Sequence, residues 1–145
     1  MKLGLIGHPL GHSWSPVIHA FMIHEDYQKW DLQEEELDAF MKRHDFDGIN
    51  VTIPYKQKVI PYLDELDPAA EAIGAVNCIV NHSGRLTGYN TDCLGFAGMV
   101  QAGQIDFKGK KTALLGTGGA SKAVGYALHQ MGADVQLVSR REKPD

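Results

Sequence analysis

Cysteine is scarce in this sequence: Cys78 and Cys93 are the two residues present, and they lack the CxxC spacing of a redox or metal motif. Two cysteines are too few for a secreted module stapled by disulfides, so a reducing cytoplasm is the expected compartment. The sequence also lacks a long apolar run, and its N-terminus does not have the charged and apolar regions of a leader. We therefore expect neither a membrane span nor a targeting segment.

Charge of one sign does not accumulate in a long block anywhere in the chain. Lys and Arg number 14 against 18 Asp and Glu, and the resulting net charge of -4 argues against binding to nucleic acid phosphates. The charge is unevenly distributed, because residues 1–103 hold seven basic and fourteen acidic side chains whereas residues 104–145 hold seven and four. With 145 residues, 43% of them hydrophobic, the chain is long enough to build a globular core.

Short apolar strands alternate with helices over the first hundred residues, which is typical of an α/β fold. Strands are expected over residues 3–6, 27–32, 48–53, 75–80 and 86–89, and helices after Ser15, over 34–41, over 55–62 and from 90–92 to about 103. The polar turn at 82–85 predicts a hairpin, and therefore a mixed sheet. We predict a mixed-sheet, three-layer α/β domain over residues 1–103 that binds substrate and carries the catalytic groups.

Residues 104–145 have the pattern of a single βαβ unit. A strand is expected over 112–115, a tight glycine turn over 116–121, a helix over 122–131 and a second strand over 135–138. A doubly wound nucleotide-binding domain contains two βαβαβ halves. This segment is therefore predicted to be the incomplete start of an NADP-binding Rossmann domain.

The glycine turn is a candidate phosphate-binding site, because glycines after a strand let the backbone approach a pyrophosphate at a helix N-terminus. Gly116 and Gly118 match the first two glycines of GxGxxG, Gly119 and Ala120 follow, and Ser121 stands at the third glycine position. An ordinary strand-to-helix turn is the alternative interpretation. The residues expected to bind the cofactor are Gly116, Gly118, Gly119, Ala120 and Arg140.

Arg140 indicates which dinucleotide is bound. NAD sites place an acid at the end of the second strand to hold the ribose 2′-hydroxyl, whereas NADP sites use Arg. The chain reads Ser139-Arg140-Arg141 at that point. We predict NADP as the cofactor, with solvated surface arginines as the alternative.

Lys56 and Asp92 are candidates for acid–base catalysis, because reduction of a carbonyl needs a proton donor beside the developing alkoxide. The alternative interpretations are that Lys56 is a solvated surface residue and that Asp92 is a helix cap.

Polar residues at predicted strand ends could hold a polyhydroxylated substrate, or could equally form caps and Asx turns: Ser13, Ser15, Asn50, Thr52, Asn77 and Asn90. The histidines do not have ligand spacing, so no metal site is predicted.

Four spaced motifs and the glycine turn together resemble the shikimate dehydrogenase family over nearly the whole chain. The motifs are Gly11-His12-Ser13-Trp14-Ser15-Pro16, Asn50-Val51-Thr52-Ile53-Pro54-Tyr55-Lys56, Gly74-Ala75-Val76-Asn77 and Gly88-Tyr89-Asn90-Thr91-Asp92. The resemblance implies reversible NADPH-dependent reduction of 3-dehydroshikimate to shikimate, on the route to chorismate and the aromatic amino acids. It also implies that Lys56 is the acid–base group and Asp92 its orienting partner. Substrate would be bound by these two residues with Ser13, Ser15, Asn50, Thr52 and Asn77.

Members of that family continue for about another domain beyond the position of Asp145. We therefore expect this chain to be an inactive part of an oxidoreductase. Two alternatives stay open: a quinate/shikimate dehydrogenase that uses NAD, and a substrate-binding module without chemistry. The expected partner is the small-molecule substrate, and the surface of residues 104–145 would also allow a homodimer.

Overall fold

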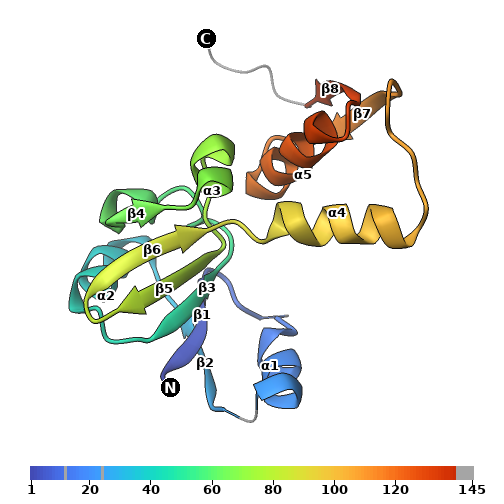
Figure 1. Ribbon diagram of the computed structural model, residues 1–145. Coiled ribbons are helices and arrows are strands. Elements are labelled where there is room, and N and C mark those ends of the chain that lie inside the picture. The colour runs from blue at the N-terminus through green and yellow to red at the C-terminus, as the bar shows by residue number, and fades with distance from the viewer. Residues whose placement is uncertain (12, 24, 140–145) are drawn as a thin grey trace.

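The computed structural model describes residues 1–11, 13–23 and 25–139, and they form two sheets (Figure 1). The larger sheet has the strand order β2-β1-β3-β5-β6-β4, in which β5 runs antiparallel to β3 and β6 while the other pairs are parallel. Its strands are β1 (Leu3–Gly7), β2 (Tyr27–Asp31), β3 (Gly48–Val51), β4 (Glu65–Leu66), β5 (Cys78–His82) and β6 (Arg85–Tyr89). The predicted α/β class with a mixed sheet is confirmed.

The helices connect these strands and lead to the second sheet. They are α1 (Ser15–Ile23), α2 (Leu37–Arg43), α3 (Pro68–Ile73), α4 (Asp92–Ala102) and α5 (Gly119–Gln130), with short 3₁₀ turns at Glu34–Glu36 and Ile60–Tyr62. The parallel strands β7 (Lys111–Leu115) and β8 (Asp134–Val138) flank α5 and form the predicted βαβ unit. In Figure 1 α4 extends from the larger sheet toward this unit. A domain boundary after Gly103 stays a prediction.

The two faces of the larger sheet have different surroundings. Side chains alternate along a strand, and Ile6, Ile49 and Val51 point to one face, where they join the buried core with residues of α2. The strand registers place Tyr27 and Asn50 on the opposite face. The fold therefore separates an apolar, fully packed face from a face on which polar side chains gather.

Helix α1 starts at Ser15 and Pro16 as predicted, but its apolar side chains do not enter the core. Val17, Phe21 and Met22 are 61%, 85% and 68% exposed. The helix contacts β2: the ring of His19 on α1 stacks against the ring of Tyr27 on β2. The helical spacing of apolar residues thus predicted the helix correctly. Such spacing usually marks a buried face, but the apolar face of α1 is not buried.

The helix expected over residues 55–62 is wrong. Turns occupy 53–59, and a single 3₁₀ turn follows at Ile60–Tyr62. Pro61 lacks a backbone N–H and therefore cannot continue an α-helical hydrogen-bond ladder. Tyr55 is 1% exposed and lies in the main core cluster, so its side chain fixes this turn segment to the core.

Two elements were not expected from the sequence. Strand β4 has two residues, too few to show a period, and α3 follows it directly. The start of α3 does carry a readable signal, because Asp67 caps it by accepting hydrogen bonds from the backbone N–H groups of Ala69 and Ala70, and Pro68 occupies the first helical position.

A small apolar cluster joins α5 to the end of the larger sheet. It contains Ile73 of α3, Ala75, Cys93 of α4, and Ala123 and Ala127 of α5. These contacts bring the first turn of α5, and with it the glycine turn, toward Lys56. No helix in the described part of the chain is long and apolar enough to cross a bilayer.

Candidate active site

Lys56 and Asp92 form the centre of the candidate site. Lys56 lies in the turn that follows β3, and Asp92 is the first residue of α4, just after β6. The Lys56 Nζ atom is 2.6 Å from Asp92 Oδ2, and the two side chains are 16% and 34% exposed. Partial removal from water strengthens this charge-assisted hydrogen bond and still leaves access for a ligand.

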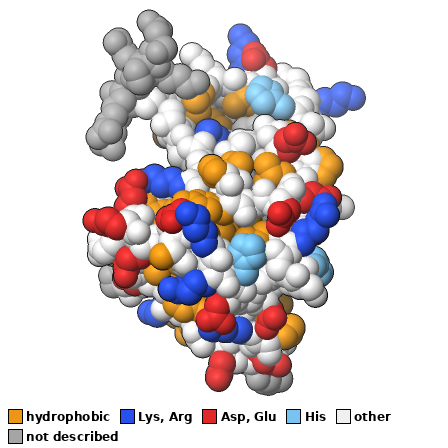
Figure 2. Space-filling view, turned by 90° about the vertical axis from the view of Figure 1, so that its left-hand side faces the viewer, with side chains coloured by type: hydrophobic (Ala, Val, Ile, Leu, Met, Phe, Trp, Pro, Cys, Tyr) orange, Lys and Arg blue, Asp and Glu red, His pale blue; other side chains and the backbone are white. Residues whose placement is uncertain are grey.

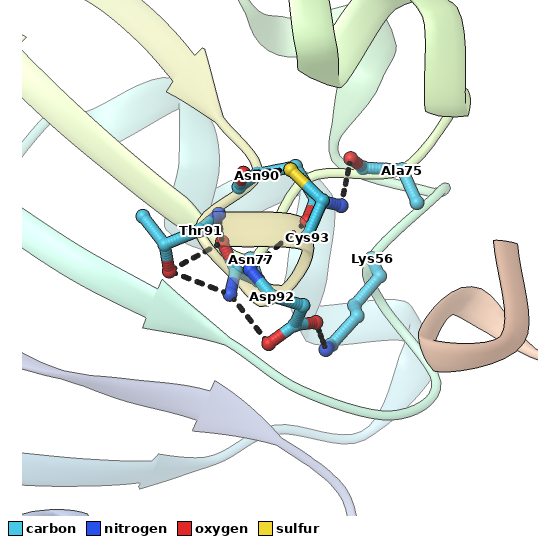
Figure 3. Close-up of polar contacts among 7 residues, drawn as sticks. All are labelled: Lys56, Ala75, Asn77, Asn90, Thr91, Asp92 and Cys93. Atoms are coloured by element: carbon cyan, nitrogen blue, oxygen red, sulfur yellow. Dashed lines mark hydrogen bonds and ion pairs between the residues drawn. The ribbon is translucent and has the colours of Figure 1, made fainter. Parts of the chain in front are cut away.

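Asn77 fixes the other oxygen of the Asp92 carboxylate. It is 8% exposed, precedes β5, and its Nδ2 atom donates to Asp92 Oδ1 at 2.8 Å and to Thr91 Oγ1 at 2.9 Å. Its Oδ1 atom accepts a hydrogen bond from the Thr91 backbone N–H at 2.8 Å. Figure 3 shows the Asp92 carboxylate between Asn77 and Lys56, so both of its oxygens have a defined direction.

Asn90 supports this arrangement from beneath. It is 2% exposed, and its Nδ2 atom donates to the backbone oxygen of Ala75 at 2.8 Å, while its Oδ1 atom accepts from the Asp92 N–H at 3.1 Å. The Cys93 thiol donates to the Asn90 backbone oxygen at 3.2 Å. Burial raises the pKa of this thiol, which keeps it protonated and available as a donor. The residues before and at the start of α4 are therefore held by buried side-chain bonds.

The predicted substrate residues of the N-terminal part lie around the same end of the sheet, in a second group. Asn50 is on β3, and its Oδ1 atom accepts a hydrogen bond from the Tyr27 hydroxyl at 2.7 Å. Ser15 opens α1, and its backbone N–H donates to Ser13 Oγ at 3.3 Å. Thr52 follows β3 and is joined to β1 through its N–H and the Ile6 oxygen at 2.9 Å.

The backbone connects this second group to the first. The Val51 N–H donates to the Asn77 oxygen at 2.8 Å, so β3 and the start of β5 are neighbours at the site. Within the described residues, the side chains of Ser13 and Thr52 make no hydrogen bond to Lys56 or Asp92. Tyr27 was not expected from the sequence, since a tyrosine at the start of a strand is an ordinary β-forming residue.

The glycine turn between β7 and α5 has the geometry of a phosphate-binding loop. Gly116 has a φ of 106°, a conformation that favours glycine, and Gly118 precedes the helix with nothing within 4 Å of the position of an added Cβ. The 12-residue helix α5 directs its first N–H groups into this turn. Gly118 and Ala120 are exposed, so the turn fits a dinucleotide phosphate.

The glycine turn also touches the candidate acid–base pair. A Cβ added to Gly119 would lie 3.2 Å from Lys56 Cδ and 3.4 Å from Lys56 Cβ. Figure 3 shows the start of α5 beside the Lys56 side chain. Arg140, the predicted 2′-phosphate residue, lies outside the described residues. Within those residues, no group of three or more His, Cys, Asp or Glu side chains is placed to hold a metal ion.

A site with a few converging polar groups at the carboxyl ends of strands, beside a dinucleotide-type turn, is typical of nucleotide-dependent α/β proteins that act on small ligands. A family model described as "Shikimate dehydrogenase substrate binding domain" matches residues 5–79. The chain belongs to this shikimate dehydrogenase family.

Individual relatives agree with the family match. A shikimate dehydrogenase (NADP(+)) of Halothermothrix orenii is 47% identical over 152 residues, covering 97% of this chain and 52% of that protein. The solved structure of shikimate dehydrogenase 1 from Peptoclostridium difficile has a TM-score of 0.92 and 37% identity, over 100% of this chain and 57% of the other. The Thermus thermophilus enzyme, solved with NADP(H) and shikimate, has a TM-score of 0.88 and 40% identity, covering 97% of this chain and 56% of the other. The chain spans about half the length of the curated relatives it matches.

Proposed function

We propose that this chain provides the substrate site and the acid–base pair of an NADP-dependent shikimate dehydrogenase, which reversibly reduces 3-dehydroshikimate to shikimate. The observation that carries the proposal is the Lys56–Asp92 pair, held at 2.6 Å and oriented by the buried Asn77. Both charged residues stand in motifs of the family. Relatives at 40% identity or more carry this activity in their names.

The proton in this reaction would move through Lys56. When the carbonyl is reduced, negative charge develops on its oxygen, and the Lys56 ammonium donates a proton to that oxygen. In the reverse direction the neutral amine of Lys56 accepts the hydroxyl proton. Asp92 stabilises the ammonium and directs it, and because Asn77 holds the second carboxylate oxygen, Asp92 cannot rotate away.

The glycine turn supports a dinucleotide cofactor, and the names of the relatives indicate NADP, which supplies the hydride when it is bound. Gly116, Gly118 and Gly119 provide the close backbone approach, and Ala120 lies in the first turn of α5. Arg140 is proposed to contact the 2′-phosphate. The remaining substrate contacts are proposed for the polar residues at the end of the larger sheet: Ser13, Ser15, Asn50, Thr52 and Asn77.

The chain by itself is proposed to bind shikimate without catalysing turnover. Support comes from its length, which is about half that of the relatives. The test is a shikimate titration of the ¹⁵N-labelled 145-residue chain. Saturable shifts at Ser13, Asn50, Asn77 and Asp92 are expected, whereas a dispersed spectrum that does not respond to shikimate would contradict the proposal. Quinate serves as a competing ligand, and tighter binding of quinate would favour the quinate/shikimate alternative.

Turnover is tested separately with NADPH and 3-dehydroshikimate. We expect no steady NADPH oxidation by the purified chain, and sustained oxidation would refute its inactivity. Binding with no turnover would also match a substrate-binding module without chemistry. Lys56→Ala in an active enzyme that contains this chain separates that alternative, because such a module needs no proton donor.

The proposed partners and compartment follow from charge and exposure. Acidic and basic side chains are interspersed on the face in Figure 2, and the net charge is -4, which supports the absence of nucleic acid binding. Cys78 and Cys93 are free thiols, which supports a reducing cytoplasm.

A homodimer is proposed because Leu115 and Leu137 of the small sheet are 75% and 47% exposed. Sedimentation of Leu115→Lys tests it, and association that is unchanged from wild type would oppose this surface as the interface.

A further inference from the structure

Tyr27 connects two of the proposed substrate residues across the sheet. It starts β2, and β1 lies between β2 and β3. The phenol therefore reaches across β1 to donate from its hydroxyl to Asn50 Oδ1 at 2.7 Å. The Ser15 side chain also lies close enough to the Tyr27 hydroxyl to lower its pKa. One tyrosine thus contacts the first residue of α1 and the penultimate residue of β3.

This contact determines what Asn50 can offer to a ligand. An Asn side chain has an acceptor oxygen and a donor NH₂ group, and the two ends have nearly the same shape. The Oδ1 end of Asn50 is occupied by Tyr27, whereas its Nδ2 end makes no hydrogen bond to another described residue. The amide is therefore presented with its donor free, which suits an acceptor oxygen such as a carboxylate or hydroxyl oxygen.

We propose that Tyr27 is a positioning residue that holds the Asn50 amide with its NH₂ group toward an acceptor oxygen of the substrate. The inference rests on the proposed function, because the ligand is shikimate or 3-dehydroshikimate. Tyr27 does not touch the reacting atoms. It acts through Asn50, and without it the amide can rotate by 180° and present an acceptor where a donor is needed, which costs affinity.

Two features keep Tyr27 in this role. Burial raises its pKa to about 12, partly offset by the nearby Ser15 side chain, so the hydroxyl keeps its proton throughout the neutral range and can donate. The His19 ring stacks on the Tyr27 ring with centroids 4.1 Å apart and 14° between the planes. This parallel contact limits the movement of the phenol.

The test is a double-mutant cycle on the 145-residue chain, with shikimate as the ligand. Tyr27→Phe removes one oxygen and keeps the ring that stacks on His19. We expect shikimate to bind about tenfold more weakly to Tyr27→Phe, and the same substitution to change affinity by less than about twofold in an Asn50→Ala background. Tyr62→Phe is the matched control, because Tyr62 packs on the core side of the sheet, and its affinity should equal that of wild type.

Each outcome supports or overturns the inference. Wild-type affinity in Tyr27→Phe, or an equal loss in both Asn50 backgrounds, would show that Tyr27 does not act through Asn50, while shikimate binding by wild type would leave the proposed function intact. If wild type does not bind shikimate, the proposed function fails separately. The Asn50 side-chain NH₂ resonances then decide the inference. Unchanged shifts and unchanged amide rotation in Tyr27→Phe would overturn it, whereas displaced shifts and faster rotation support it.

Discussion

The Lys56 ammonium lies 2.6 Å from the Asp92 carboxylate, although the two residues are 36 positions apart in the sequence. The sheet order produces this contact. Strand β5 lies between β3 and β6 and runs antiparallel to both, so the carboxyl ends of β3 and β6 are at the same edge. Lys56 follows one of these ends and Asp92 follows the other, and each brings its charge to that edge.

Removal of Lys56 tests the proton transfer. In an active enzyme that contains this chain, Lys56→Ala is expected to lower kcat about 10²- to 10⁴-fold with a much smaller rise in KM, because the proposed mechanism makes the ammonium the proton donor in the transition state. Steady-state kinetics measure both constants. Lys58→Ala is the matched control, since Lys58 is an exposed lysine two residues away that pairs with Glu34 at 2.7 Å. A change confined to KM would contradict the catalytic role of Lys56.

Loss of the Asn77 side chain should affect both stability and the site. Asn77→Ala leaves the N–H of Thr91 and one Asp92 oxygen without their partner in a partly buried network, at an expected cost of about 1–3 kcal/mol in the free energy of unfolding. It should also weaken shikimate binding, because Asp92 is then free to rotate. Urea denaturation and the shikimate titration measure the two effects.

Asn81→Ala separates these two effects. Asn81 lies on β5, the strand that follows Asn77, and its Nδ2 atom donates to the backbone oxygens of His44 and Phe46 at 2.9 and 2.8 Å. Asn81→Ala is expected to lower the free energy of unfolding by a similar amount, and the folded protein should bind shikimate with unchanged affinity. Equal losses of affinity in both variants would mean that Asn77 acts only through general stability.

The four motifs provided the candidate site residues from the sequence, and the structure brings Lys56, Asp92 and Asn77 into contact, but these contacts could not be predicted from the motifs. Spacing along the chain cannot show that Lys56 meets Asp92, because that contact depends on the position of β5 in the sheet. The contact of Tyr27 with Asn50 was missed for a similar reason. It reaches Asn50 across an intervening strand, and strand order is a tertiary property.

Local signals explain the other agreements and errors. The βαβ unit was predicted from a glycine turn between apolar runs and the hairpin from a polar turn at 82–85, and the structure has both. The prediction of a helix over 55–62 was wrong because Pro61 has no backbone N–H to continue an α-helical hydrogen-bond ladder. The exposure of Phe21 could not be predicted, since a hydrophobic spacing defines a helix face and does not state what covers it.

Gly119→Ala tests the contact between the glycine turn and Lys56. The new methyl group would lie 3.2 Å from Lys56 Cδ, and that side chain is held at its far end by Asp92. We expect a loss of shikimate affinity of about threefold, because the methylene chain must move by a few tenths of an ångström. Gly118→Ala is the control, since its added methyl meets nothing within 4 Å and its φ is -76°. Equal affinities of the two variants would show that Lys56 adapts without loss.

Asp31 should make the loop after β1 sensitive to acid. Its Oδ1 atom lies 2.7 Å from His8 Nδ1, and its Oδ2 atom accepts the Leu10 N–H at 3.1 Å. These bonds, that of His8 above all, lower the pKa of Asp31 below its ordinary value of 3.8. A carboxyl whose pKa is lower in the folded state stabilises the fold above the unfolded pKa, and this contribution is lost as the pH falls through the folded value.

The pH dependence is measured by comparing urea denaturation of wild type and Asp31→Asn. At pH 7 the variant should be less stable, and the difference should shrink as the pH falls below about 4, because protonated Asp31 loses the same ionic interactions that the amide lacks. Asp26→Asn is the control, since Asp26 is exposed and accepts no hydrogen bond from the described residues. A difference between wild type and Asp31→Asn that stayed constant from pH 7 to pH 2 would show that the charge of Asp31 does not hold the loop. It would assign any loss to the shape of the side chain instead.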